Sequence, residues 1–334
     1  MADELAPTSS LGAGIVQIRL PMAGNPLRYV NGYLVEDDDG YTLIDCGWKA
    51  DDVFAALHAG LAEHGVALGD VRRLAITHFH FDHYGSAGTL LDAGVPELLM
   101  HARDWETARE HGTDPVAADA AADAWLARNG FHVAASSDEN PQHHRYDLVR
   151  PTRFVQHGER IGRLRALWTP GHAPGHLCLL DTVSGQLFSG DHVLDPITPH
   201  VGSWREGRGD VLGAYVASLR AVAACGASGV LPAHGEPFPD LGRRVAELLA
   251  HEAAREAQVL AALAAAPASA ADVARMLPWR RRGDRFTQLA PAHQEFAVAE
   301  TLAHLEHLRA RGIVACDAQA EPIRYTALAA AQRV

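Results

Sequence analysis

The stretch THFHFDHYG, residues 77–85, gathers the side chains best suited to chemistry. His78, His80, Asp82 and His83 fall within six positions of one another. Neutral imidazole nitrogens and an aspartate oxygen suit zinc, iron or manganese, whereas calcium prefers oxygen ligands alone. In an extended backbone the side chains of His78, His80 and Asp82 would point the same way, and a bend would bring His83 back to them. The pattern predicts a transition-metal site.

Further candidate ligands appear later in the chain, each after an apolar run and beside glycines or prolines. TPGHAPGH contributes His172 and His176, LFSGDH contributes Asp191, and VLPAHGEP contributes His234. Folds of the α/β class build their sites from polar residues that follow separate strands. We therefore expect these side chains to converge on the first cluster.

The elements that must position these residues alternate between strands and helices. Short β-rich runs at GIVQIRLP, RYVNGYLVED and GYTLIDCG come first, and VRRLAIT predicts a strand ending at Thr77. Helical spacing follows in ADDVFAALHAGLAEHG and GSAGTLLDAGV. Residues 102–150 look like an inserted helical segment with an irregular loop at 136–147. Their aromatic residues Trp105, Trp125 and Phe131 could cover the site, although core packing is the simpler interpretation for each. An α/β domain over residues 1–244 is expected.

From residue 245 to 334 the pattern becomes helical. A long amphipathic stretch, a short helix capped by Ser269 and Asp272, and a helix opened by Pro291 precede a hairpin. Three helices followed by a hairpin predict a small winged-helix-like domain. The third helix, with the apolar residues Phe296, Leu302, Leu305 and Leu308, and the hairpin have enough apolar surface to pair two copies of the chain, so a homodimer is expected.

Composition narrows the classes of function. The net charge of the 334-residue chain is −12, so a partner bound through nucleic-acid phosphates is not expected. Its four cysteines form no CxxC pair, which argues against a disulfide framework and a thiolate metal site. With no apolar run near 20 residues and no basic, apolar leader, a cytoplasmic protein without a membrane partner is expected. One lysine, many arginines and abundant alanine indicate a bacterial, GC-rich genome.

Taken in order, IDCG, THFHFDHYG, TPGHAPGH, FSGD and PAHGEP resemble the metallo-β-lactamase fold superfamily, over roughly residues 15–240. The resemblance implies an αββα sandwich and two divalent metal ions, with zinc expected first and iron or manganese as alternatives. It implies that His78, His80 and His172 hold one metal, that Asp82, His83 and His234 hold the other, and that Asp191 bridges them. His176 would lie beside the ligands, and Asp45 would support them.

The resemblance extends to the glyoxalase II-like and β-lactamase-like protein 2 branches, the latter through ETLAHLEHLRARGIV in the C-terminal domain. It implies a hydrolase in which a metal-bridging hydroxide attacks a thioester, lactone or other acyl bond of a small molecule. Asp82 and Asp191 would orient that nucleophile and are the expected catalytic residues. An endoribonuclease, a DNA-binding regulator acting through the winged helix and a redox di-iron protein remain as alternatives.

Overall fold

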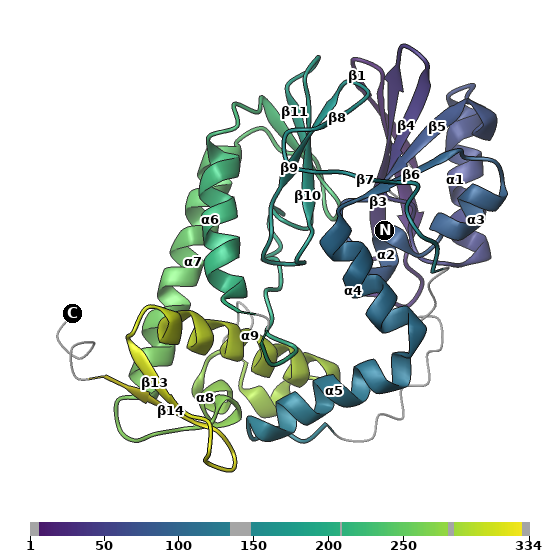
Figure 1. Ribbon diagram of the computed structural model, residues 1–334. Helices are drawn as coiled ribbons and strands as arrows, with labels where there is room; N and C mark the ends of the chain where they lie inside the picture. The colour runs from purple at the N-terminus through teal and green to yellow at the C-terminus, as the bar shows by residue number, and fades with distance from the viewer. Residues whose placement is uncertain (1–6, 134–147, 208, 280–283, 329–334) are drawn as a thin grey trace. The chain divides into compact units, whose positions relative to one another are not determined.

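The computed structural model describes residues 7–133, 148–207, 209–279 and 284–328 (Figure 1). The chain divides into two compact units, each assembled from several stretches of sequence. The first unit comprises residues 1–115, 140–199 and 218–245, and the second comprises the remainder. The segment 102–150, expected as an insert, therefore contributes chain to both units. Its expected loop at 136–147 lies outside the described residues.

A seven-stranded sheet forms one half of the first unit. Its strands follow chain order: β1 (Thr8–Gly12), β2 (Ile15–Pro21), β3 (Tyr29–Asp37), β4 (Gly40–Ile44), β5 (Val71–Ala75), β6 (Glu97–Met100) and β7 (Arg153–Phe154). Pairing is antiparallel from β1 to β4 and parallel from β4 to β7. The strand β5 ends at Ala75, two residues before the expected end at Thr77, so the backbone that carries the first histidines is a loop.

A five-stranded sheet forms the other half of the first unit. Its order is β12 (Gly229–Pro232), β11 (Gln186–Gly190), β10 (Leu177–Asp181), β9 (Leu164–Trp168) and β8 (Arg160–Ile161). Only the pairing of β11 with β12 is parallel. All five residues of β10 are buried, as a near-continuous apolar run predicts for a central strand.

The two sheets enclose an apolar core to which both contribute. Ile15, Val35 and Leu99 from the first sheet and Leu179 and Phe188 from the second belong to this one cluster. The opposite face of the first sheet packs against the helices α1 (Asp51–Glu63) and α3 (Ala87–Asp92), which bury residues such as Leu57 and Leu90 (Figure 1). A helix-covered two-sheet sandwich of the expected α/β class is thus confirmed.

Two further helices belong to the first unit and lie close to the candidate ligands in sequence. The single-turn helix α2 (Phe81–Tyr84) carries Asp82 and His83, and α4 (Ala102–Thr113) begins directly after β6 and His101. The bend expected at His83 is therefore a helical turn. The helices α6 (Val211–Ala223) and α7 (Leu241–Ala262) each contribute residues to both units.

The second unit is mostly helical. Besides parts of α6 and α7 it contains α5 (Pro115–Arg128) except its first residue, α8 (Ala270–Met276), α9 (Pro291–Ala310) and the hairpin β13 (Val314–Asp317) to β14 (Arg324–Ala327). The expected capping of α8 is present, because the Ser269 hydroxyl accepts from the Asp272 N–H and the Asp272 carboxylate accepts from the Ser269 N–H. Three helices and a hairpin follow one another as expected.

The core of the second unit accounts for several aromatic and apolar residues. Trp125 and Phe131, which could have covered the site or packed in a core, pack in this core, and so do Leu302, Leu305 and Leu308 of α9. The apolar face of α9 is therefore largely used inside the unit, although Phe296 keeps 45 % of its surface exposed. The homodimer remains a prediction. No helix within the described residues is both long and apolar enough to cross a membrane.

Candidate metal centre

The candidate ligands emerge from loops that follow four strands of the first unit. His78 and His80 follow β5, and His172 follows β9. Asp191 directly follows β11, and His234 lies two residues beyond β12. Since β5 belongs to the first sheet and the other three strands belong to the second, the site joins the two sheets of the sandwich.

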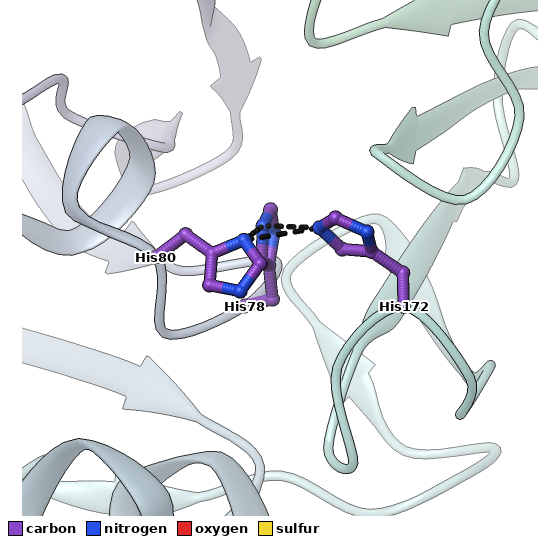
Figure 2. Close-up of side chains that lie close together, drawn as sticks. All are labelled: His78, His80 and His172. Atoms are coloured by element: carbon purple, nitrogen blue, oxygen red, sulfur yellow. Dashed lines mark hydrogen bonds between the residues drawn. The ribbon is translucent and has the colours of Figure 1, made fainter. Parts of the chain in front are cut away.

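Three histidines form one group in which ring nitrogens point at each other (Figure 2). The Nε2 atom of His78 lies 3.0 Å from His80 Nδ1 and 3.2 Å from His172 Nε2, and the last two atoms are 3.0 Å apart. Tetrahedral zinc with bonds of 2.0–2.1 Å would separate two nitrogen ligands by about 3.3 Å. The triangle has the size of three ligands around one small cation.

Asp82, His83 and His234 form a second group. The Nε2 atoms of His234 and His83 lie 3.2 Å and 3.6 Å from Asp82 Oδ2. The ligand atoms of this group lie within 4.8 Å of one another, as do those of the first group. Both groups thus offer three donors to a common point.

Asp191 lies between the two groups. Its Oδ1 atom is 3.7 Å from His83 Nε2 and 3.5 Å from His234 Nε2, while its Oδ2 atom is 3.6 Å from His172 Nε2. One carboxylate oxygen therefore faces each group. This is the arrangement that a bridging carboxylate requires.

Hydrogen bonds on the far side of three of the five rings orient their ligand nitrogens. His83 Nδ1 lies 2.8 Å from Asp45 Oδ2, and His234 Nδ1 lies 3.1 Å from the carbonyl oxygen of Tyr29. His78 Nδ1 lies 3.1 Å from Thr77 Oγ1. When Nδ1–H donates to such an oxygen, Nε2 keeps its lone pair for a metal. The surroundings of His78, His83 and His234 thus support the tautomer that leaves Nε2 free for a metal.

Carboxylates outnumber other charges around His83. Burial lowers its pKa, but the carboxylates of Asp82, Asp45 and Asp191 outweigh burial and raise the pKa of His83 to about 10. Burial likewise lowers the pKa of His234, and Asp191 and Asp82 raise it above its usual value. Three carboxylates within a buried site create a negative potential that favours cations.

Orphaned polar atoms test whether the site fits metal ions. His83 Nε2, His234 Nε2 and Asp191 Oδ1 are buried and lack a hydrogen-bond partner. Buried polar atoms without a partner carry a cost of about 1–3 kcal/mol each. All three atoms belong to the expected ligand set and lie together at the second group, because Asp191 Oδ1 is 3.7 Å from His83 Nε2 and 3.5 Å from His234 Nε2, so one cation there would satisfy them. The donor set fits zinc, and it also suits iron or manganese.

The neighbours of the ligands include residues that sequence patterns did not single out. Asn31 Nδ2 donates to the carbonyl oxygens of Pro232 and Gly235, and Tyr33 Oη donates to Pro232 O, so both brace the loop of His234. His176, expected beside the ligands, accepts the backbone N–H of Asp191 at Nε2. A Cβ atom at Gly190 would lie 2.6 Å from His176 Nε2, so this contact requires glycine.

Residues 25–234 match the family model described as metallo-beta-lactamase superfamily, and residues 257–328 match metallo-beta-lactamase-like, C-terminal domain. A crystal structure of a metallo-beta-lactamase family protein from Thermus thermophilus superposes with a TM-score of 0.80 at 30 % identity. It covers 96 % of this chain and 100 % of that one.

Two fungal relatives carry names that state an activity. Thioesterase pkgB of Emericella nidulans is 29 % identical over 71 % of this chain and 55 % of its own. Atrochrysone carboxyl ACP thioesterase AacuM of Aspergillus aculeatus is 28 % identical over 71 % of this chain and 60 % of its own. The chain spans less than two thirds of the length of these curated relatives.

Proposed function

This chain belongs to the metallo-beta-lactamase superfamily, and from that premise we propose that it is a hydrolase that uses two metal ions to cleave a thioester. The observation that carries the proposal is the position of Asp191, with one oxygen facing each group of nitrogen donors. His78, His80 and His172 would hold the first cation. Asp82, His83 and His234 would hold the second, with Asp191 between them.

The cations, when bound, would lower the pKa of a water molecule to near neutrality and polarise the carbonyl of the substrate. The protein's own contribution is orientation. Asp82 and Asp191 are the more exposed carboxylates of the centre, with 19 % and 13 % of their side chains accessible, whereas the His83 side chain is fully buried. Their oxygens can accept hydrogen bonds from the attacking water and fix its direction.

A thioester suits this machinery because its leaving group is a thiol. The pKa of a thiol is about 8.5, so a thiolate can depart with less help from a proton donor than an alkoxide or an amide nitrogen needs. The relatives named as thioesterases point to the same bond. Lactones and other acyl bonds share the attack on a carbonyl and are the next substrates to test.

The test is a hydrolysis panel with zinc-loaded protein. Released thiol is followed for acyl thioesters, and lactones, β-lactams and RNA are assayed in parallel. Asp191→Ala is compared with His58→Ala, which changes an exposed histidine on α1. We expect thioester hydrolysis by the wild type and by His58→Ala, and a loss of at least about 100-fold in kcat/KM for Asp191→Ala. Cleavage of RNA without thioester hydrolysis would contradict the proposed substrate.

A further inference from the structure

A buried carboxylate on α4 connects two loops that carry candidate ligands. The Asp104 residue is fully buried. Its Oδ2 atom accepts the backbone N–H of Phe79 at 3.0 Å, and its Oδ1 atom accepts the backbone N–H of Gly175 at 2.5 Å. Phe79 lies between His78 and His80, and Gly175 lies three residues after His172. One side chain therefore touches both loops that form the group of three histidines.

The same helix also supports the first loop through a ring contact. The Phe79 ring stacks on the ring of His111, with centroids 5.6 Å apart and planes inclined by 29°. His111 Nδ1 lies 2.7 Å from the carbonyl oxygen of Thr107 one turn earlier, which fixes that ring on the helix. The backbone and the side chain of Phe79 are thus both held by α4, a helix in the segment that sequence patterns present as an insert.

The second loop approaches so closely that only glycine fits. A Cβ atom at Gly175 would lie 2.6 Å from Asp104 N and 2.8 Å from Asp104 Oδ1. Distances under 3.0 Å to backbone require a shift of the loop or the helix. The contact between Asp104 and this loop therefore depends on the absence of a side chain at position 175.

The position of Asp104 explains how a buried carboxylate is tolerated. It lies in the first turn of α4, where the helix dipole favours negative charge. Hydrogen bonds from N–H groups to a carboxylate are stronger than those between neutral groups. Both acceptor oxygens are thereby committed to backbone donors, one from each loop, so movement of either loop would strain the other.

We propose that Asp104 is a positioning residue that sets the separation of His78 and His80 from His172. This inference rests on the metal centre of the proposed function, because the spacing of the three nitrogens matters only if they bind one shared cation. The second group is oriented from elsewhere, since His83 and His234 meet oxygens of Asp45 and Tyr29. Asp104 thus governs the site of three histidines and leaves the second site nearly unchanged.

The test measures zinc affinity with a competing chromophoric chelator, so no catalytic readout is needed. Asp104→Asn keeps the shape of the side chain but replaces one acceptor oxygen with an NH₂ group. That group cannot accept a hydrogen bond, so one of the two backbone N–H groups loses its acceptor. It is made in the His234→Ala background, which leaves the site of three histidines intact, and in the His172→Ala background, which leaves the second site. Glu106→Gln, an exposed change of the same charge on α4, is the control.

We expect Asp104→Asn to weaken zinc binding 10- to 100-fold in the His234→Ala background and less than about threefold in the His172→Ala background. Gly175→Ala, which displaces the loop but keeps the carboxylate, should weaken the same site. The effects of Asp104→Asn and Gly175→Ala on zinc affinity should be far from additive in the double variant, because both changes break the same contact.

Three results would overturn the inference. Unchanged affinity in both Asp104→Asn and Gly175→Ala would exclude a positioning role. Equal weakening of both sites, in step with a lower thermal midpoint of the metal-free protein, would show a general structural role instead. Zinc uptake by neither site of the wild type would contradict the proposed function as well, which distinguishes the two failures. If Asp104→Asn does not fold, the result for Gly175→Ala decides.

Discussion

Asp45 Oδ2 lies 2.8 Å from His83 Nδ1, and the same carboxylate also accepts the N–H and the hydroxyl of Thr77 at 2.8 Å. One buried side chain thus orients a candidate ligand and holds Thr77 at the start of the loop that carries His78 and His80. Asp45 adopts a positive φ of 58°, which a non-glycine residue rarely takes, so the surrounding contacts hold this backbone in place.

The first prediction concerns this contact. Asp45→Asn presents an NH₂ group to one of its three donors, so the orientation of His83 is lost. We expect zinc affinity at the site of Asp82, His83 and His234 to fall 10- to 100-fold, as measured by chelator competition. Asp92→Asn, an exposed change on α3, is the control. Wild-type affinity in Asp45→Asn would show that the contact does not support metal binding.

The second prediction separates the two sites by stoichiometry. His172→Ala removes a nitrogen from the first group only, and His234→Ala removes one from the second only, so each variant should lose one of two bound zinc ions. Asp191→Ala should weaken both sites, because its oxygens face both groups. Elemental analysis after dialysis measures the number of zinc ions bound per chain. Two ions retained by His172→Ala would refute the assignment of the first site.

A third prediction tests the support of the His234 loop. Tyr33 Oη donates to Pro232 O at 2.7 Å in the core. Tyr33→Phe removes this donor at constant shape, and we expect the free energy of unfolding in denaturant to fall by about 1 kcal/mol. Tyr41→Phe, at a half-buried position in β4, should change it by less than about 0.5 kcal/mol. Equal effects would mean that the Tyr33 hydroxyl adds no support of its own.

Stability should also depend on pH through His307 of the second unit. The hydrogen bond to Glu256 raises the pKa of His307; burial opposes this, and Asp210, with its carboxylate 2.8 Å away, raises it further. A raised pKa in the folded state means that the protonated ring stabilises the fold fully below the unfolded value of about 6.5. That contribution is lost as the pH rises through the folded pKa.

The fourth prediction follows from this loss of stability with rising pH. At about pH 6, close to the unfolded pKa, His307→Gln should unfold with a free energy about 1.5–3 kcal/mol below that of the wild type. The difference should narrow as the pH rises above the folded pKa. Denaturant unfolding at a series of pH values measures it, with the exposed His293→Gln as control. A difference that grows with pH would contradict the assignment.

Much of the fold could be predicted from local patterns, because apolar alternation, helical spacing and capping residues each favour one kind of secondary structure. Alternating apolar runs bounded by glycine and proline marked β2, β3 and β4, and helical spacing marked α1 and α9. Pro291 and the pair Ser269–Asp272 correctly marked helix starts. The edge strand β1 was missed, since TSSLG is largely exposed and has little β-branched or apolar content.

Residues whose role depends on distant backbone could not be found in this way. Asp104 is one of several acidic residues in a helical stretch, and nothing local shows that it meets N–H groups 25 and 71 positions away. Asn31 and Tyr33 sit in an ordinary strand pattern. For Trp125 and Phe131 the sequence left both a cover for the site and core packing open, and they pack in a core with residues from Val259 onward. A domain boundary near residue 245 and a winged-helix assignment remain predictions.

The measurement closest to the central claim is a crystal structure of zinc-loaded protein with anomalous data collected on both sides of the zinc edge. Two anomalous peaks are predicted, one within about 2.0–2.2 Å of donor atoms of His78, His80 and His172 and one equally close to Asp82, His83 and His234. Asp191 should contact both. Peaks absent from this cluster, or a single peak bound by other residues, would contradict the account.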